Sequence, residues 1–124
     1  MVDRYAELYR AYRWDVPARK AILSNGSPDL LEPLVRNSGL AFEAVISVDE
    51  LRVFKPAPQV YELAARRLGV PKERIGFVSS NCWDALGAKS YGFRVYWINR
   101  GGAPLDQLGF RPDEQVKSVD EVLR

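Results

Sequence analysis

Two hydroxyls, an amide and a carboxylate stand close together in the stretch Ile75–Asp84, directly after a run of apolar residues. Residues 75–78 read as a buried strand, Ser79–Asn81 as a polar turn, and Trp83 with Asp84 as a helix start. The strand ends of open α/β sheets are where such proteins bind ligands. These residue types are equally common in ordinary turns and helix caps. On this stretch alone, both interpretations stay open.

Two other predicted strands also end in polar residues. Ser24 and Asn25 follow the apolar residues 21–23, and Lys55 lies beyond the apolar residues 44–48. The carboxyl ends of parallel strands meet at one edge of a sheet, so these groups are expected to converge with the carboxylate of the opening stretch. A lysine about 4 Å from that carboxylate would be attracted by about 4 kcal/mol before desolvation is subtracted. Alternatively, Lys55 is a surface lysine in a loop.

Composition limits the classes of function. The 124 residues predict one domain, and a net charge of +2, from 18 basic and 16 acidic side chains, does not indicate a nucleic-acid partner. The chain has no histidine, which excludes every histidine-dependent triad, base and metal ligand within it. The single cysteine, Cys82, fits a reducing compartment, and no apolar stretch is long enough to span a membrane. We expect a cytoplasmic protein with no membrane partner.

Strands and helices alternate along the chain. Strands are predicted at 21–23, 44–48, 75–78 and 95–98, with a short fifth one near Val116. Helices are predicted at 3–12, from Ser27 to Gly39, at 56–69, after Asp84 to Tyr91, and from Ser118. Pro33 must kink the second helix or delay its start. The alternation indicates an α/β fold with a doubly wound parallel sheet in one domain, 1–124.

Four segments together resemble a known family. They are Ile22–Ser27, Val53–Pro56 with Tyr61, Phe77–Asp84 and Trp97–Arg100. In this combination they closely resemble the (S)-2-haloacid dehalogenases, hydrolases of the haloacid dehalogenase (HAD) superfamily, over residues from about Ala21 to the C-terminus. The resemblance implies a Rossmann-like core at 21–124 and makes 1–20 a remnant of a cap or linker helix.

The turn after residue 78 separates these dehalogenases from the phosphatases of the superfamily. The phosphatases carry Gly-Asp-Ser/Thr-x-x-Asp there, whereas this chain has Ser80 in place of the first aspartate. Mg²⁺ prefers carboxylate oxygens, so the loss of one carboxylate weakens a metal site. The resemblance therefore implies metal-independent chemistry without a cofactor. A Mg²⁺-dependent phosphatase is the less favoured alternative.

In the family, an aspartate attacks C2 of a 2-haloalkanoic acid and displaces halide with inversion, and water then hydrolyses the ester. The resemblance implies that Lys55 holds the nucleophile ionised. It also implies that Ser79, Asn81 and Asp84 position the nucleophile, the lysine and the hydrolytic water. These four residues are the predicted catalytic set.

The resemblance implies a second set of residues at the substrate. Ser24 would bind the substrate carboxylate, Asn25 would cradle the departing halide, Trp83 would wall the halide site, and Tyr61 would lie near Lys55. Alternative interpretations remain for three of them. Tyr61 and Trp83 could be packing residues, and Asn25 could be only a turn former.

One part of the family pattern has no counterpart in this chain. The family's nucleophilic aspartate ends a strand that lies between those at 21–23 and 75–78. Upstream, only Asp3, Glu7 and Asp15 are acidic, and none follows an apolar strand. The resemblance thus implies an incomplete core, and we expect little or no dehalogenase activity from the chain alone.

An incomplete core leaves several possibilities for the whole protein. The exposed strand edges would invite a complementing N-terminal segment or a second copy of the chain, forming a homo-oligomer. Otherwise, strands 21–23 and 75–78 would pair directly. A different class of function also remains, in which the chain is a non-catalytic α/β remnant that serves as an interaction module.

Overall fold

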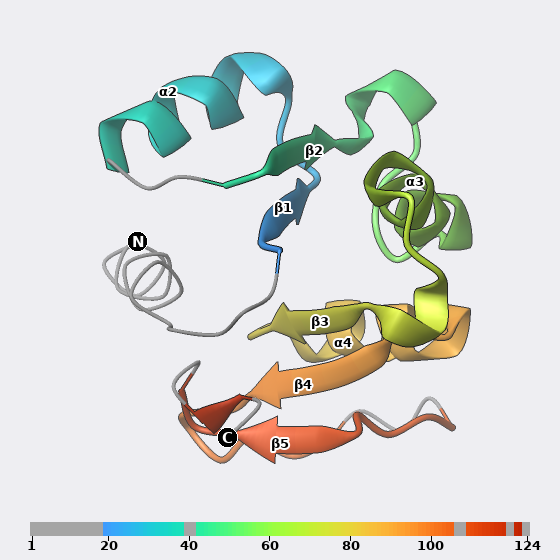
Figure 1. Ribbon diagram of the computed structural model, residues 1–124. Helices are drawn as coiled ribbons and strands as arrows, with labels where there is room; N and C mark the ends of the chain where they lie inside the picture. The colour runs from blue at the N-terminus through green and yellow to red at the C-terminus, as the bar shows by residue number, and fades with distance from the viewer. Residues whose placement is uncertain (1–18, 39–41, 106–108, 119–120, 123–124) are drawn as a thin grey trace.

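The computed structural model describes residues 19–38, 42–105, 109–118 and 121–122. Strands and helices alternate, as the sequence predicts (Figure 1). The strands are β1 (Ala21–Ser24), β2 (Ala44–Ser47), β3 (Gly76–Ser79), β4 (Arg94–Ile98) and β5 (Glu114–Val116). The helices are α2 (Pro28–Ser38), α3 (Pro58–Leu68) and α4 (Cys82–Tyr91), with the short 3-10 helices η1 (Val48–Leu51) and η2 (Lys72–Arg74).

All strand pairings between the described residues are parallel, but they form two separate sheets. One sheet contains β1 and β2, with Ser24 opposite Ser47, and the other has the order β3-β4-β5, with Ser79 opposite Trp97. The parallel α/β class is therefore confirmed. Within the part of the chain that the structure describes, β1 and β3 are not paired. The alternative in which these two strands close directly on each other is wrong.

Helix α3 joins the two sheets by packing (Figure 1). Its buried Leu63 and Ala64 pack with Ile46 of β2, while its buried Tyr61 packs with residues of α4 and β4. Leu23 of β1 touches both of these apolar clusters. Burial of apolar surface needs no particular hydrogen-bond register, so it holds β1–β2 against the rest of the fold without a strand pairing.

Proline affects the two helices α2 and α3 differently. Helix α2 begins at Pro28, at the start of the predicted segment, so Pro33 lies inside it and does not delay it. The helix lacks the bond that an N–H of residue 33 would make. Helix α3 begins at Pro58 and not at Pro56. Pro56 and Pro58 both suit a first helical position. The N–H of Ala57 donates to the carbonyl of Phe54, however, and this bond keeps Pro56 in a turn.

In the stretch Ile75–Asp84, β3 ends one residue later, and α4 begins earlier, than the sequence predicts. Ser79 is the last residue of β3, and α4 begins at Cys82, with Asn81 at its N-cap position. Asp84 thus lies in the first turn of α4 and does not precede the helix.

The predicted helix at 3–12 falls outside the described residues. The division of the domain at residue 20 stays a prediction. Among the described helices, none is long and apolar enough to cross a membrane.

Candidate active site

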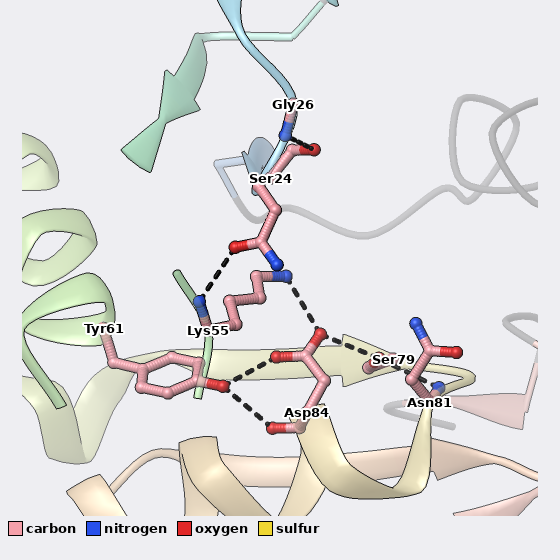
Figure 2. A network of polar contacts seen from close by, with 8 residues as sticks. Ser24, Gly26, Lys55, Tyr61, Ser79, Asn81 and Asp84 are labelled. Carbon is pink, nitrogen blue, oxygen red and sulfur yellow. Dashed lines mark hydrogen bonds and ion pairs between the residues drawn. The ribbon is translucent and has the colours of Figure 1, made fainter. Parts of the chain in front are cut away.

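A buried ion pair lies at the centre of the polar network (Figure 2). The Nζ atom of Lys55 is 2.9 Å from Oδ2 of Asp84, and their side chains are only 10% and 4% exposed. Lys55 comes from the loop before α3, and Asp84 from the first turn of α4. The alternative of a solvated surface lysine does not fit this burial. Removing two charges from water is costly, so a pair this deeply buried needs good geometry and further hydrogen bonds.

Asp84 receives those further hydrogen bonds from two hydroxyls. Ser79 Oγ lies 3.0 Å from Oδ2, and the hydroxyl of Tyr61 donates to Oδ1 over 2.7 Å. The Tyr61 side chain is fully buried. Its burial, together with the negative charge and hydrogen bond of Asp84, raises the pKa of Tyr61 well above its usual range. Tyr61 therefore stays a donor, and both oxygens of Asp84 are occupied as acceptors.

Asn25 ties the exit of β1 to the lysine loop. Its Oδ1 accepts the backbone N–H of Lys55 over 2.8 Å. Ser24 Oγ accepts the N–H of Gly26, and the hydroxyl of Ser47 in β2 donates to the carbonyl of Gly26. These bonds fix the loop between β1 and α2. They also bring the carboxyl ends of β1 and β3 to the same network, as the sequence predicts, because Lys55 contacts both.

The residues before Asp84 form the open side of the network. The backbone N–H of Asn81 donates to Ser79 Oγ over 3.1 Å, while the Asn81 side chain makes no capping hydrogen bond to α4. The Asn81 amide is therefore not used to start the helix. Trp83 is 42% exposed although it is a large apolar residue. This exposure argues against a core position for Trp83, and its predicted role at the halide site stays a prediction.

Most of the eight predicted site residues lie in or next to the network around Asp84. Five of the eight predicted residues belong to one connected network, namely Asn25, Lys55, Tyr61, Ser79 and Asp84. Asn81 joins it through its backbone. Ser24 bonds to Gly26, two residues along the same loop, and Trp83 is the neighbour of Asp84 in the chain. The substrate and catalytic roles of all eight stay predictions.

Phe77 is a part of the site that sequence reasoning missed. Lys55 Nζ lies 5.3 Å from the centroid of its ring, in a cation–π arrangement. The ring also meets the ring of Tyr61 edge-on, with 5.6 Å between the centroids. Side chains alternate between faces along a strand, so Phe77 lies on the same face of β3 as Ser79. That two-residue spacing was the available signal.

This arrangement holds a cation in place next to the strand ends. The ammonium of Lys55 has three N–H donors, of which Asp84 takes one. Within the described residues, no other acceptor bonds to Nζ, so the other two donors suit a second anion such as a carboxylate. Among the described residues, no three acidic or cysteine side chains are grouped so that they could hold a metal ion. Metal independence itself stays a prediction.

A lysine, a carboxylate and hydroxyls thus gather at the carboxyl ends of parallel strands, the edge at which open α/β sheets bind ligands. Residues 13–92 match the family described as haloacid dehalogenase-like hydrolase. This match covers more than half of the chain, and the protein therefore belongs to the haloacid dehalogenase-like hydrolases.

Known relatives agree with this assignment. The chain is 48% identical over 104 residues to (S)-2-haloacid dehalogenase 2 of Pseudomonas sp. (strain CBS-3), a match that covers 82% of this chain and 45% of the relative. The L-2-haloacid dehalogenase of Xanthobacter autotrophicus has a similar structure, with a TM-score of 0.85 and 36% identity, covering 94% of this chain and 58% of the other. The structure of that enzyme with chloropropionic acid covalently bound matches with a TM-score of 0.78 and 38% identity, covering 95% and 56%. The chain thus spans less than half of its curated relative's length.

Proposed function

We propose that this chain supplies the lysine–aspartate half of the active site of a 2-haloacid dehalogenase, a hydrolase that replaces the halogen of a 2-haloalkanoic acid by a hydroxyl. The observation that carries the proposal is the buried Lys55–Asp84 pair, joined to Ser79, Tyr61 and Asn25 at the strand ends. The resemblance and the dehalogenase relatives support it. The covalently bound chloropropionic acid in one relative supports a covalent intermediate.

In the proposed reaction, an aspartate oxygen forms a bond to C2 while the carbon–halogen bond breaks and halide leaves with the electron pair. Water then adds to the ester carbonyl, which releases the 2-hydroxy acid and restores the carboxylate. Lys55 keeps the attacking carboxylate ionised and in place through its remaining N–H donors. Asp84 fixes the lysine, and Tyr61 and Ser79 fix Asp84.

The attacking carboxylate is not Asp84 in this proposal. Both of its oxygens accept hydrogen bonds, and its side chain is 4% exposed, so neither oxygen is free to reach a substrate carbon. We propose that a separate segment carries the nucleophile on a strand that binds between β1 and β3. Among the described strands, β1 pairs only with β2 and β3 only with β4, and both lead into the network, which supports this proposal (Figure 1). A metal-independent reaction in the cytoplasm is part of the same proposal.

The substrate-binding role is proposed for residues in or beside the Asp84 network, namely Ser24, Asn25 and Trp83. Ser24 and the N–H groups at the start of α2 would bind the substrate carboxylate, since the first N–H groups of a helix suit an anion. Asn25 has its Oδ1 engaged by Lys55, and its amide N–H groups would face the departing halide. Trp83 would line the halide site, consistent with its exposure. Tyr61 is fully buried, and its bond to Asp84 supports positioning more than direct substrate contact.

The test is halide release from (S)-2-chloropropionate without added metal. The full chain is assayed alone and mixed with the N-terminal half of the Pseudomonas CBS-3 relative, as the source of the proposed nucleophile strand. Binding of the two pieces is measured in parallel by size-exclusion chromatography with light scattering. This measurement also reports whether the chain forms a homo-oligomer. Activity in the mixture alone is the expected result.

Two variants make the assay specific. Lys55→Met in the chain should abolish halide release by the mixture, and Lys117→Met, at an exposed residue outside the network, should not. Activity of the chain alone would contradict the proposed division of the site. An assembled but inactive mixture would favour a non-catalytic interaction module. Phosphate release that requires Mg²⁺ would favour the phosphatase alternative.

A further inference from the structure

Helix α4 carries a glycine at an interior position, one turn after Asp84. Glycine weakens the interior of a helix relative to alanine, so Gly87 needs a local reason. The contacts of Gly87 supply one. A Cβ atom at position 87 would lie 2.6 Å from the Cβ of Pro56 and 2.8 Å from the hydroxyl oxygen of Tyr61. Such distances are far below van der Waals contact between these atoms.

The two neighbours of Gly87 belong to the two partners of Asp84. Pro56 directly follows Lys55, and its Cβ is part of a ring fused to the backbone, so it cannot rotate away. The hydroxyl of Tyr61 is held by Asp84 Oδ1 at 2.7 Å. Any side chain at position 87 would therefore push the lysine segment and the tyrosine away from α4 together.

We propose that Gly87 is a positioning residue of the Asp84 network. The missing side chain lets Tyr61 and the Lys55–Pro56 segment approach α4 closely enough for both to reach one carboxylate. Gly87 touches no reacting group itself and acts through Tyr61 and Lys55. Its effect on catalysis rests on the proposed function, but its effect on the network does not.

The experiment replaces Gly87 by alanine in the full chain. Gly101→Ala is the matched control, because a Cβ at position 101 meets no atom within 4 Å. Two measurements need no substrate. The first is the urea midpoint of unfolding, and the second is the NMR signal of tyrosine labelled with ¹³C at Cζ, with the Tyr61 signal assigned by its loss in Tyr61→Phe.

Gly87→Ala should lower the urea midpoint, although alanine is the better helix former. It should also shift the Tyr61 Cζ signal and leave the signal of Tyr96, which lies in β4 away from this contact, in place. Gly101→Ala should change neither measurement. A raised or unchanged midpoint together with an unmoved Tyr61 signal would overturn the proposal.

A double variant covers the case in which Gly87→Ala does not fold. Tyr61→Phe removes the oxygen that a Cβ at position 87 would strike, so the cost of Gly87→Ala should be smaller in the Tyr61→Phe background than in the natural chain. Equal cost in both backgrounds would show that the tyrosine is not involved and would overturn the proposal as stated. If Gly87→Ala does not fold, folding of the double variant is the expected result, because only the contact with Pro56 then remains at full strength.

The catalytic consequence is measured in the two-piece mixture described above. A displacement of about 1 Å in a positioning network lowers rates by about 100-fold. Gly87→Ala should therefore lower kcat by about that factor while KM changes little, since Ser24 and Trp83 are outside the contact. An unchanged kcat in an active mixture would refute the catalytic role. If the natural mixture shows no turnover, the proposed function fails, and the NMR and urea results still decide the role of Gly87.

Discussion

Removing the charge of Lys55 should destabilise the protein strongly, because it leaves Asp84 buried without a cation. The two charged atoms are 2.9 Å apart, which corresponds to a gross attraction of about 6 kcal/mol at an effective dielectric constant of about 20. Desolvation of the two ions cancels most of this value in the intact pair. Breaking the pair is different, because one desolvated charge remains. We expect Lys55→Met to cost about 3 kcal/mol, at the lower end for buried pairs, since Ser79 and Tyr61 still bond to Asp84.

The assay is equilibrium unfolding in urea, followed by the fluorescence of the buried Trp97. A loss of about 3 kcal/mol lowers the urea midpoint by about 1.5 M for a slope near 2 kcal/mol per molar. The matched variants are Asp84→Asn, which keeps the shape of the carboxylate, and the double variant Lys55→Met/Asp84→Asn. In the double variant no charge is buried, and the new amide can donate to Ser79.

These three variants form a double-mutant cycle whose result can refute the reasoning. If the pair is coupled as the geometry indicates, the double variant should be more stable than the sum of the two single effects predicts, by about 2 kcal/mol. Additive single effects, or a loss below about 1 kcal/mol for Lys55→Met, would show that the pair behaves like an exposed one. The burial argument for the active site would then be wrong.

Three further predictions follow from single contacts. Asn25→Ala should lower the free energy of unfolding by about 1–2 kcal/mol, because the N–H of Lys55 loses its acceptor. Asn25→Asp keeps an acceptor oxygen and should retain most of the stability, and urea unfolding measures both variants. Burial alone would raise the pKa of Asp113, but the hydrogen bonds that its carboxylate accepts from Lys89 and a backbone N–H outweigh burial and lower the pKa. The ionised carboxylate therefore stabilises the fold above about pH 4, and this stabilisation is lost as pH falls further. The stability difference between the natural chain and Asp113→Asn should accordingly shrink in urea titrations between pH 6 and pH 3, values chosen to bracket about pH 4. Because the pKa of Tyr61 is raised in the folded protein, the unfolded chain ionises first as pH rises above about 10, and the free energy of unfolding then falls. In urea unfolding, Tyr61→Phe should therefore lose less stability than the natural chain above that pH.

Much of the local structure was predictable from the sequence. Apolar runs at 21–23, 44–48 and 95–98 identify strands correctly because buried parallel strands need continuous apolar residues. Gly69 and Gly92 end α3 and α4 with positive φ angles of 65° and 125°. The errors fall at element starts, where several residues suit the same role. Pro56 and Pro58 are both acceptable first residues of α3, and only the turn from Phe54 to Ala57 decides between them.

The convergence of the site was predictable in outline only. Parallel strands end at one edge, so the sequence alone could place Asn25, Lys55 and Asp84 near one another. It could not show that Lys55 and Asp84 are buried and paired, because burial depends on what packs around them. It also left the role of Tyr61 open between core and substrate. The 23-residue separation of Tyr61 and Asp84 is bridged only when α3 packs against α4.

The α/β fold class follows from the sequence, because the alternation of apolar strands and amphipathic helices is a local property of the chain, and the family follows from the resemblance of four short segments. How those elements meet depends on long-range packing. It separated the sheet into β1–β2 and β3–β4–β5, joined the two parts through α3, and placed Gly87 against Pro56 and Tyr61. These contacts join residues far apart in the sequence, and their distances follow from the packing of whole side chains, which no local pattern of residues encodes.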